Sequence, residues 1–269
     1  MTGEHSETVL ITGASSGIGL ELAKCFADDG ANLILVARTT QALEKLADEL
    51  QQEFSIKATV ITADLTQSDS AAKIFADVKG RGLTADVLVN NAGFGLHGAF
   101  TELPLKRQLE IVTVNISALV ELTGLFLPGM LARKRGGILN VGSVAGFVPG
   151  PNMAVYYASK AFVQSFSEAL YQELRGTNIK LTNLCPGPTD TNFSQTARMH
   201  RTRRTSVNKM SAEAVAEIGH EDFRAGKFLS VPGSANKLAA IAPRFLPRAV
   251  VRRIIGHYNK LTPTGSGSA

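Results

Sequence analysis

Short apolar runs alternate along this chain with longer segments whose apolar residues recur at helical spacing. A short apolar run predicts a buried strand, whereas recurrence every three or four positions predicts an amphipathic helix. We expect strands at residues 8–12, 31–37, 56–62, 86–90, 137–141, 179–185 and 227–231. We expect helices up to residue 29 and at residues 41–53, 67–79, 104–133, 152–175, 211–224 and 247–259. This alternation predicts a layered α/β domain.

The composition agrees with one aliphatic α/β domain of 269 residues. Hydrophobic residues make up 44% of the chain, which is enough for a sizeable core. Tryptophan is absent and aromatic residues are few, which argues against a stacking surface for nucleic acid. Cys25 and Cys185 lie in apolar stretches without metal-ligand spacing, so we expect reduced core cysteines and no metal site.

Reduced cysteines are typical of cytosolic proteins, so we predict a cytoplasmic location. Residues 1–7 are polar and contain no apolar core of a signal peptide, and no apolar run is expected to span a bilayer. Residues 264–269 are rich in glycine and serine, and we expect them to form a flexible tail after a single domain of residues 1–263.

A glycine-rich turn follows the first predicted strand and leads directly into a predicted helix. Glycines let the backbone approach a pyrophosphate, and the N–H groups at a helix N-terminus bind its negative charge. The turn is therefore a candidate dinucleotide site. Its residues are Gly13, Ser15, Ser16, Gly17, Ile18 and Gly19. A plain tight turn is the alternative, because the spacing differs from the common Gly-x-Gly-x-x-Gly pattern.

The end of the second strand bears on the choice of dinucleotide. Arg38 and Thr39 follow this strand, and no carboxylate stands at the corner. Folds that select NAD use Asp or Glu there to bind the ribose 2′-hydroxyl, whereas a guanidinium pairs with a 2′-phosphate. Arg38 therefore favours NADP(H), and a solvated loop arginine is the alternative.

The third and fourth strands also end in candidate cofactor contacts. Asp64 and Leu65 follow the third strand, where the carboxylate can touch the adenine edge or cap the next helix. Small residues after the fourth strand let the backbone lie close to a ribose. These residues are Asn91, Ala92 and Gly93. Bracing of the loop is the alternative role for Asn90 and Asn91.

Two polar residues lie in sequence contexts that make them candidates for chemistry. Asn115 lies in apolar surroundings within the predicted 104–133 helix, where a buried amide must be hydrogen-bonded. We expect it to be a structural peg or part of a water relay. Ser143 follows the fifth strand, at the sheet edge where open α/β folds bind ligands.

Tyr156 and Lys160 lie four residues apart in a predicted helix, and so on one face of it. The ammonium favours the phenolate and lowers the pKa of the tyrosine, which can then exchange a proton with a substrate oxygen. Taken alone, the pair is more simply a half-buried ring beside a solvated lysine. The glycine turn, the serine and the asparagine favour the catalytic interpretation.

The sixth strand ends in a rigid turn that we expect to hold the nicotinamide end of a cofactor. Its candidate contacts are Pro186, Gly187, Thr189 and Thr191. The ordered motifs from Thr8 to Thr191 resemble the short-chain dehydrogenases/reductases, and more loosely the bacterial ketone, 3-ketoacyl and steroid-type reductases among them. The motifs are Thr12-Gly13 with Gly17-Ile18-Gly19, Asn90-Asn91-Ala92-Gly93, Asn115, Ser143, Tyr156 with Lys160, and Pro186-Gly187 with Thr191.

The resemblance implies a doubly wound Rossmann fold with about seven parallel strands. It also implies a catalytic tetrad in which Tyr156 gives a proton to the carbonyl oxygen. Lys160 lowers the pKa of Tyr156 and binds the nicotinamide ribose. Ser143 hydrogen-bonds the carbonyl, and Asn115 holds a water that links Lys160 to solvent.

The implied reaction is hydride transfer between NADP(H) and a small-molecule carbonyl/alcohol substrate. We expect it to run as the reduction of an apolar ketone, aldehyde or 3-oxoacyl compound. An NADP(H)-binding sensor or interaction module with little catalysis is the alternative.

Two basic segments follow the sixth strand. The family likeness predicts a lid over the substrate at about residues 189–210. Its basic side chains are Arg198, His200, Arg201, Arg203, Arg204 and Lys209. They can attract an anionic substrate or carrier, and a solvated loop is the simpler alternative.

The second basic segment, residues 235–260, mixes cationic and apolar side chains. Pro243 and Pro247 divide it, which predicts a short helix, a turn and a helix at 247–259. We expect it to cover the pocket or to contact another subunit, and peripheral contact with an anionic membrane is a less favoured alternative. Apolar helix faces predict a homodimer or homotetramer.

Overall fold

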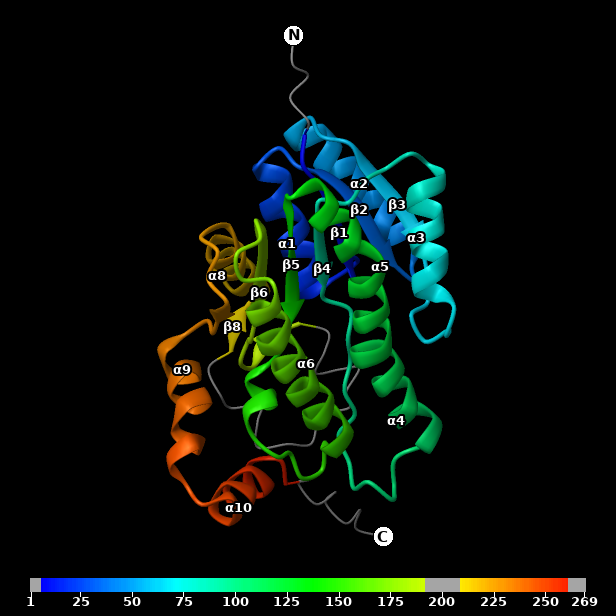
Figure 1. Ribbon diagram of the computed structural model, residues 1–269. Coiled ribbons are helices and arrows are strands. Elements are labelled where there is room, and N and C mark those ends of the chain that lie inside the picture. Colours follow the sequence, from blue (N-terminus) through cyan, green and yellow to red (C-terminus); the bar gives the residue numbers. More distant parts are fainter. Residues whose placement is uncertain (1–5, 192–208, 261–269) are drawn as a thin grey trace.

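Seven parallel strands run through the centre of the molecule in the computed structural model, which describes residues 6–191 and 209–260 (Figure 1). The strands are β1 (Thr8–Thr12), β2 (Asn32–Ala37), β3 (Ala58–Thr62), β4 (Val87–Asn90), β5 (Gly136–Val141), β6 (Ile179–Leu184) and β9 (Leu229–Ser230). Their order in the sheet is β3-β2-β1-β4-β5-β6-β9. The order reverses between β1 and β4, and open α/β sheets bind ligands outside the strand ends at such a point. The predicted doubly wound fold is confirmed.

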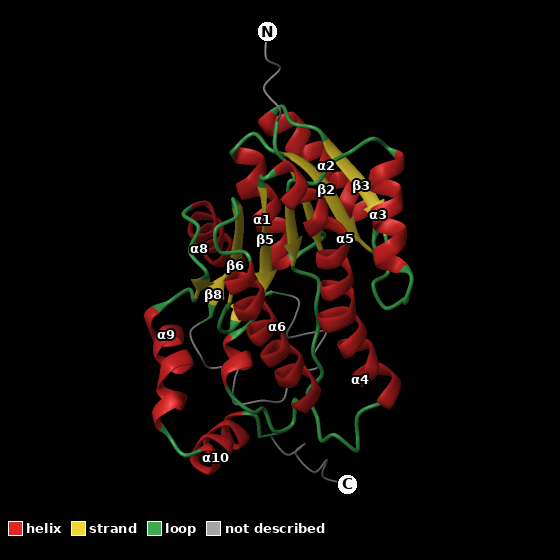
Figure 2. Cartoon of the chain, viewed as in Figure 1, coloured by secondary structure: helices red, strands yellow, loops and turns green. Residues whose placement is uncertain are grey.

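Helices cover both faces of this sheet (Figure 2). They are α1 (Gly17–Asp28), α2 (Thr40–Phe54), α3 (Ser70–Gly80), α4 (Leu105–Val112), α5 (Ala118–Arg133), α6 (Ala154–Glu173), α8 (Ala212–Arg224), α9 (Ser234–Ile241) and α10 (Arg248–Tyr258). Helices α1, α2 and α8 pack on one face, and α3, α5 and α6 pack on the other. Burial on both faces explains why the strands are almost continuously apolar.

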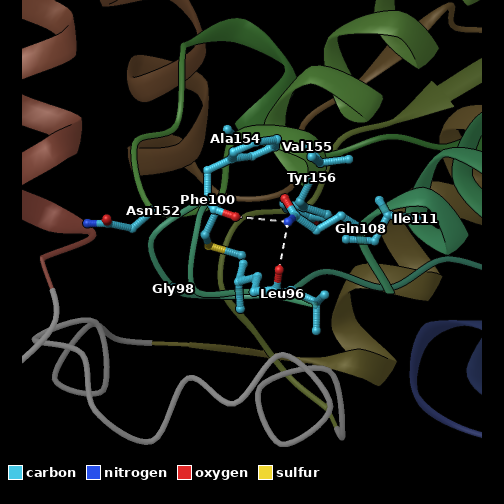
Figure 3. A pocket seen from close by; sticks show the side chains of 11 residues that line it. Leu96, Gly98, Phe100, Gln108, Ile111, Asn152, Ala154, Val155 and Tyr156 are labelled. Atoms are coloured by element: carbon cyan, nitrogen blue, oxygen red, sulfur yellow. Dashed lines mark hydrogen bonds between the residues drawn. The ribbon is translucent and has the colours of Figure 1, made fainter. Parts of the chain in front are cut away.

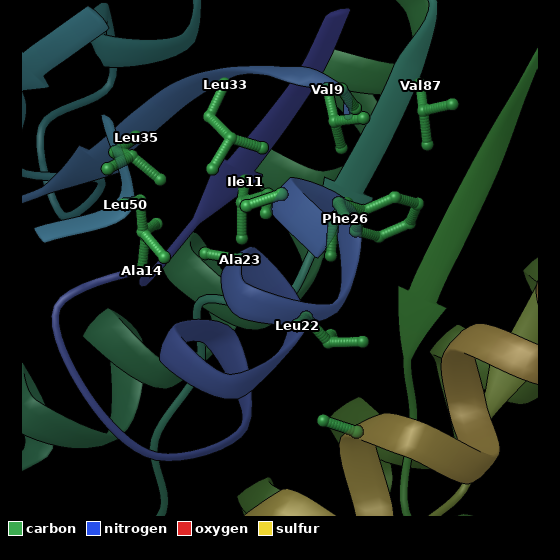
Figure 4. Close-up of a cluster of buried hydrophobic side chains, with 14 of the residues drawn as sticks. Val9, Ile11, Ala14, Leu22, Ala23, Phe26, Leu33, Leu35, Leu50 and Val87 are labelled. Atoms are coloured by element: carbon green, nitrogen blue, oxygen red, sulfur yellow. The ribbon is translucent and has the colours of Figure 1, made fainter. Parts of the chain in front are cut away.

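The core on the α1 face shows how residue spacing sets the packing (Figure 4). Val9 and Ile11 point to this face because alternate residues of β1 share a side, whereas Leu10 belongs to the opposite cluster. Leu22 and Phe26 lie one turn apart in α1 and meet these strand residues. The helical spacing seen in the sequence therefore corresponds to the buried side of α1.

The predicted 104–133 helix is a continuous helical stretch with an irregular centre. A π-helical turn at Thr113–Ser117 separates α4 from α5, and Asn115 lies in this turn. The sequence predicted a regular helix, because one added residue in one turn barely changes the apolar spacing. π-Helical turns are rare in proteins, and those that do occur are often found at functional sites.

Residues Leu105–Arg133 are also long and apolar enough to cross a membrane by length and composition, contrary to the sequence expectation. Leu122, Phe126 and Met130 of this stretch are buried in the core cluster that contains β4 and β5 residues. Burial of these side chains against the sheet is what is expected of a helix in the protein core.

Several predicted ends differ by a few residues. The last strand is Leu229–Ser230 rather than 227–231, and the helix that contains Tyr156 and Lys160 spans Ala154–Glu173 rather than 152–175. One side of this helix is partly internal, since Leu170 is buried and Phe166 packs against the same core. Phe162 stacks on Phe166 at the surface.

The predicted lid is described only at its two ends. Strand β7 (Thr189–Asp190) pairs with β8 (Met210–Ser211), so the two ends are held side by side. Most of its basic residues lie outside the described residues: Arg198, His200, Arg201, Arg203 and Arg204. The predicted tail at 264–269 also lies outside them.

The chain after β9 forms an arm that leads away from the sheet (Figure 1, orange to red). Helix α9, a 3₁₀ turn at Ala242–Phe245 and α10 follow one another. Residues 234–260 are called the C-terminal arm below. The predicted division into two helices at the prolines is confirmed.

Candidate active site

The turn after β1 has a backbone shape that requires glycine. Gly13 and Gly17 have φ of +67° and +58°, in the left-handed region that other residues rarely adopt. A Cβ at Gly19 would collide with the Asn91 side chain and the Gly13 carbonyl. The turn therefore brings bare backbone to the N-terminus of α1, where an anionic group can bind.

The end of β4 is fastened to this turn. Asn91 Nδ2 donates to Thr12 O (2.8 Å) and to Gly13 O (3.2 Å). The Thr12 hydroxyl accepts from the N–H groups of Asn91 and Ala92, both at 3.0 Å. The bracing interpretation of Asn91 thus has direct structural support.

The surroundings of α1 favour an anionic ligand. No acidic residue lies in its first turn, and within the described residues the Ser16 side chain makes no capping hydrogen bond at its N-terminus. Arg38 is exposed after β2 and forms no ion pair with any residue that the structure describes. A Cβ built on Gly17 would lie 3.1 Å from Thr191 Cγ2, so the segment after β6 reaches the turn.

Asp64 and Leu65 have local roles in the structure. Asp64 Oδ1 accepts from Thr66 N (3.0 Å), whereas α3 begins later, at Ser70. Asp64 is therefore not the N-cap of that helix, because the helix starts three residues beyond the predicted start. Leu65 is buried in the core. Contact of Asp64 with adenine stays a prediction.

Lys160 is a buried lysine at the carboxyl end of the sheet. Its Nζ donates to the Val141 carbonyl at the end of β5 (2.7 Å). Burial lowers its pKa to about 8, although the neighbouring Cys185 acts in the opposite direction. Burial in turn raises the pKa of the Cys185 thiol to about 12. A cation held in this way is costly and is characteristic of functional sites.

Ser143 and Tyr156 lie on two elements that pack together. Ser143 Oγ accepts from Ala145 N (3.1 Å) and donates to Pro186 O (3.4 Å), so it caps the 3₁₀ turn at Val144–Phe147. Ala145 in this turn and Tyr156 of α6 belong to one buried cluster. The serine is thereby held at the end of β5, beside the helix that carries Tyr156 and Lys160.

Asn115 is hydrogen-bonded through its whole amide. Nδ2 donates to Phe94 O (3.1 Å) and Ser159 Oγ (2.9 Å), and Oδ1 accepts from Phe94 N (3.1 Å). A Cβ at Gly93 would lie 3.1 Å from Asn115 Oδ1 and 3.6 Å from Lys160 Nζ. The side chains of Asn115 and Lys160 thus both lie next to Gly93. The hydrogen bonds of the Asn115 amide to other protein groups are those expected of a structural peg.

A row of buried asparagine side chains lies under this site, and it was not predicted from the sequence. Asn90, Asn140 and Asn183 are in register on β4, β5 and β6. Asn90 Nδ2 donates to Asn140 Oδ1 (2.9 Å), and Asn140 Nδ2 donates to Ser167 Oγ of α6 (2.9 Å). The sequence does contain a signal for this row, because a polar residue stands near the end of each of three apolar strands. The row ties the strands that end in the site to the helix of Tyr156.

A cavity of about 30 Å³ adjoins Tyr156 (Figure 3). Most of its lining is apolar: Leu96, Gly98, Phe100, Leu103, Ile111, Met153, Ala154 and Val155. The Gln108 amide in its wall donates to Phe100 O (3.0 Å) and Leu103 O (3.1 Å). The cavity holds about one water, and it marks an apolar wall beside the tyrosine.

The comparisons with known proteins agree with this geometry. The short chain dehydrogenase family model matches residues 7–202. A very-long-chain 3-oxoacyl-CoA reductase of Laccaria bicolor is 37% identical over 65% of this chain, and the match spans 52% of that relative's length. The mouse dehydrogenase/reductase SDR family member 7B is 33% identical over 93% of this chain and 81% of its own.

Two solved structures are similar over nearly the full chain. A short-chain dehydrogenase from Sphingobium yanoikuyae in complex with NADPH is 30% identical, with a TM-score of 0.80 over 98% of both chains. A short chain dehydrogenase/reductase from Burkholderia phymatum in complex with NAD is 26% identical, with a TM-score of 0.79 over all of both chains. Both nicotinamide cofactors thus occur among similar proteins.

Proposed function

This chain belongs to the short-chain dehydrogenase family, and we propose that it is an NADP(H)-dependent reductase of apolar ketones, aldehydes or 3-oxoacyl compounds. The family assignment makes it an oxidoreductase of carbonyl/alcohol pairs. The cofactor preference, the direction and the substrate class are the proposed part.

One observation carries the proposal: the buried Lys160 ammonium lies one helical turn from Tyr156, beside a glycine turn that can accept a dinucleotide. A purely structural lysine gains little from such burial, because it loses its hydration and finds no carboxylate. A cation beside a phenol has a chemical use, since it favours the phenolate. The cost of burying Lys160 is therefore consistent with a role in proton transfer.

The proposed roles follow from where the side chains lie. Tyr156 gives a proton to the oxygen of the substrate carbonyl, and Lys160 favours the resulting phenolate. Ser143 Oγ lies at the end of β5 and donates a hydrogen bond to the same oxygen as charge develops. The nicotinamide cofactor supplies the hydride when bound.

We propose that the cofactor-binding residues are those expected from the sequence. Gly13, Gly17 and Gly19 leave room for a pyrophosphate at the start of α1. Pro186 and Thr191 are the contacts proposed for the nicotinamide end. The remaining proposed contacts are Ser15, Ser16, Ile18, Thr39, Asp64, Leu65, Asn91, Ala92, Gly93, Gly187 and Thr189.

NADP(H) selection is assigned to Arg38. Its guanidinium is exposed beside the cradle, without a competing carboxylate, so it can pair with a 2′-phosphate. Paired titration with NADPH and NADH, followed by nicotinamide fluorescence, tests this assignment. We expect tighter NADPH binding, and Arg38→Ala should weaken NADPH at least about tenfold while leaving NADH unchanged. Equal or tighter binding of NADH by the native protein would overturn the assignment.

An apolar substrate is supported by the wall beside Tyr156 and by the reductases among the relatives. The polar amide of Gln108 is already hydrogen-bonded to backbone carbonyls, so this wall offers mainly hydrocarbon contact. A screen of ketones, aldehydes and 3-oxoacyl thioesters with NADPH tests the class. Preference for polar sugars over all three groups would contradict it.

Self-association remains part of the proposal. The surface of α4, α5 and α6 exposes several large apolar side chains that a second copy can cover. They are Leu105, Leu109, Val112, Val120, Phe162 and Tyr171. Light scattering at several concentrations distinguishes the proposed homodimer or homotetramer from a monomer.

A further inference from the structure

The outer face of the C-terminal arm is apolar to an unusual degree for a surface. Phe245 is 82% exposed and Leu238 is 67% exposed. The exposed large apolar residues of the arm are Leu238, Ile241, Phe245, Leu246, Val250 and Ile254. Continuous apolar surface of this kind marks an interaction site.

Within each helix of the arm, the exposed apolar side chains recur at helical spacing, so they lie on one side of that helix. Leu238 and Ile241 are three residues apart in α9, and Phe245 follows one further turn on. Val250 and Ile254 are four residues apart in α10. An adjoining side of α10 holds the arm to the body, because Val251 is buried and Ile255 packs on the cluster that contains Tyr156 and Tyr157.

The same arm is strongly cationic. Its basic residues are Lys237, Arg244, Arg248, Arg252, Arg253 and Lys260, and it contains no acidic residue. The arm thus has six of the chain's 28 lysines and arginines and none of its 23 acidic residues, which leaves 22 cationic and 23 anionic side chains elsewhere. All six are exposed, and none pairs with an acidic residue in the described part of the chain.

The combination of exposed apolar and cationic side chains distinguishes between three possible partners of the arm. A second copy is disfavoured, because a two-fold contact would bring two cationic arms together. An acidic soluble protein would satisfy the charges but would leave much of the large apolar side-chain surface in water. An anionic bilayer satisfies both, since its headgroups attract arginine and its acyl region takes up hydrocarbon.

We propose that the outer face of the C-terminal arm docks on an anionic lipid bilayer. Phe245 and its apolar neighbours enter the boundary between headgroups and acyl chains, and the arginines lie among the lipid phosphates. Because Ile255 of the same arm packs beside Tyr156, docking brings the bilayer close to the catalytic helix. The inference does not depend on which substrate is reduced.

Vesicle sedimentation of the purified full chain tests the charge requirement. Phosphatidylcholine vesicles that contain phosphatidylserine should bind the protein at low salt at least about tenfold more tightly than pure phosphatidylcholine vesicles. Replacing Arg244, Arg248 and Arg252 by glutamine should lower this binding at least about tenfold. The matched control replaces exposed Lys57, Lys79 and Lys106 by glutamine, which changes the net charge equally. Equal losses in both variants, or no binding by the native chain, would overturn the proposal.

A second measurement separates lipid insertion from simple charge attraction. The chain contains no tryptophan, so Phe245→Trp adds a single indole at the outer face. Its emission should shift to the blue with anionic vesicles and be quenched by brominated acyl chains. Gln52→Trp, at an exposed position of α2, is the control and should show neither change. If the indole emission of vesicle-bound Phe245→Trp were not quenched, insertion into the bilayer would be excluded. Stronger binding to soluble polyglutamate than to the vesicles would also overturn the proposal.

Discussion

Asn115 Nδ2 donates a 2.9 Å hydrogen bond to Ser159 Oγ, which joins the π-helical turn to the helix of Tyr156 and Lys160. Ser159 Oγ donates in turn to the Tyr156 carbonyl (2.7 Å). Ser159 therefore links Asn115 to the backbone of Tyr156 in α6. The position of Asn115 in a rare helical turn is explained by the need to reach both Phe94 and Ser159.

We predict that Asn115→Ala lowers the free energy of unfolding by about 2–4 kcal/mol, because it removes this partner from the part-buried backbone groups of Phe94 and from the buried Ser159 hydroxyl. Ser159→Ala removes fewer of these bonds and should cost about 1 kcal/mol. Urea denaturation of both variants measures the difference. An equal loss of unfolding free energy in the two variants would show that the hydrogen bonds of Asn115 with Phe94 do not stabilise the fold.

Tyr156→Phe should retain NADPH binding and lower turnover by at least about a hundredfold, because the proton donor is removed while the ring remains. Tyr157→Phe is a matched control on the same helix, since its hydroxyl contacts Asn259 rather than the substrate side. This control should keep turnover. Unchanged turnover in Tyr156→Phe would refute the proton-donor role proposed for Tyr156.

The Lys160 pKa predicts a pH dependence of stability. It is about 8 in the folded protein and 10.5 in the reference state, so the unfolded chain binds more protons between these values. The free energy of unfolding should therefore rise with pH from about 8 to 10.5, by roughly 3 kcal/mol for this group. Below pH 8 the full cost of burying the charge is present.

Lys160→Met isolates this effect, because the variant lacks the titrating group. The stability of the native protein relative to Lys160→Met should increase as the pH rises through this window, as measured by denaturant unfolding at several pH values. A difference that stays constant with pH would show that Lys160 is not desolvated in the folded protein.

The strands and helices were predictable because both sheet faces are buried and each helix has one buried side. Leu22 and Phe26 in α1 show this relation directly. The order of the motifs also indicated the family. Strand ends could not be located to the residue, since pairing rather than apolarity ends a strand, as at Leu229–Ser230.

The site was less accessible to sequence reasoning because its side chains are joined by tertiary contacts. No local pattern shows that Asn140 meets Asn90 and Ser167, or that Asn115 lies in a π-turn. Asp64 was compatible with a helix cap, and only the later start of α3 excludes that role. Cytoplasmic location and the extent of the lid stay predictions.

Asn259 fastens the end of the C-terminal arm to the chain near the active site. Nδ2 donates to Pro151 O (3.1 Å) and to the Tyr157 hydroxyl (3.2 Å), and the Asn259 carbonyl accepts from Asn152 Nδ2 (3.1 Å). His97 Nε2 also lies 2.8 Å from this carbonyl. Because Asn259 is fully buried, these contacts are shielded from competing water.

Asn259→Ala should release α10 locally while the sheet and the cofactor cradle remain folded. The variant loses both side-chain donations, and α10 has few other buried contacts, chiefly Val251 and Ile255. We expect amide hydrogen exchange in α10 to accelerate at least about tenfold, with NADPH affinity unchanged. Tyr157→Phe removes only the contact with the hydroxyl and should accelerate exchange less. Unchanged exchange in Asn259→Ala would mean that apolar packing alone holds the arm, and equal acceleration in both variants would assign the fastening to the hydroxyl of Tyr157.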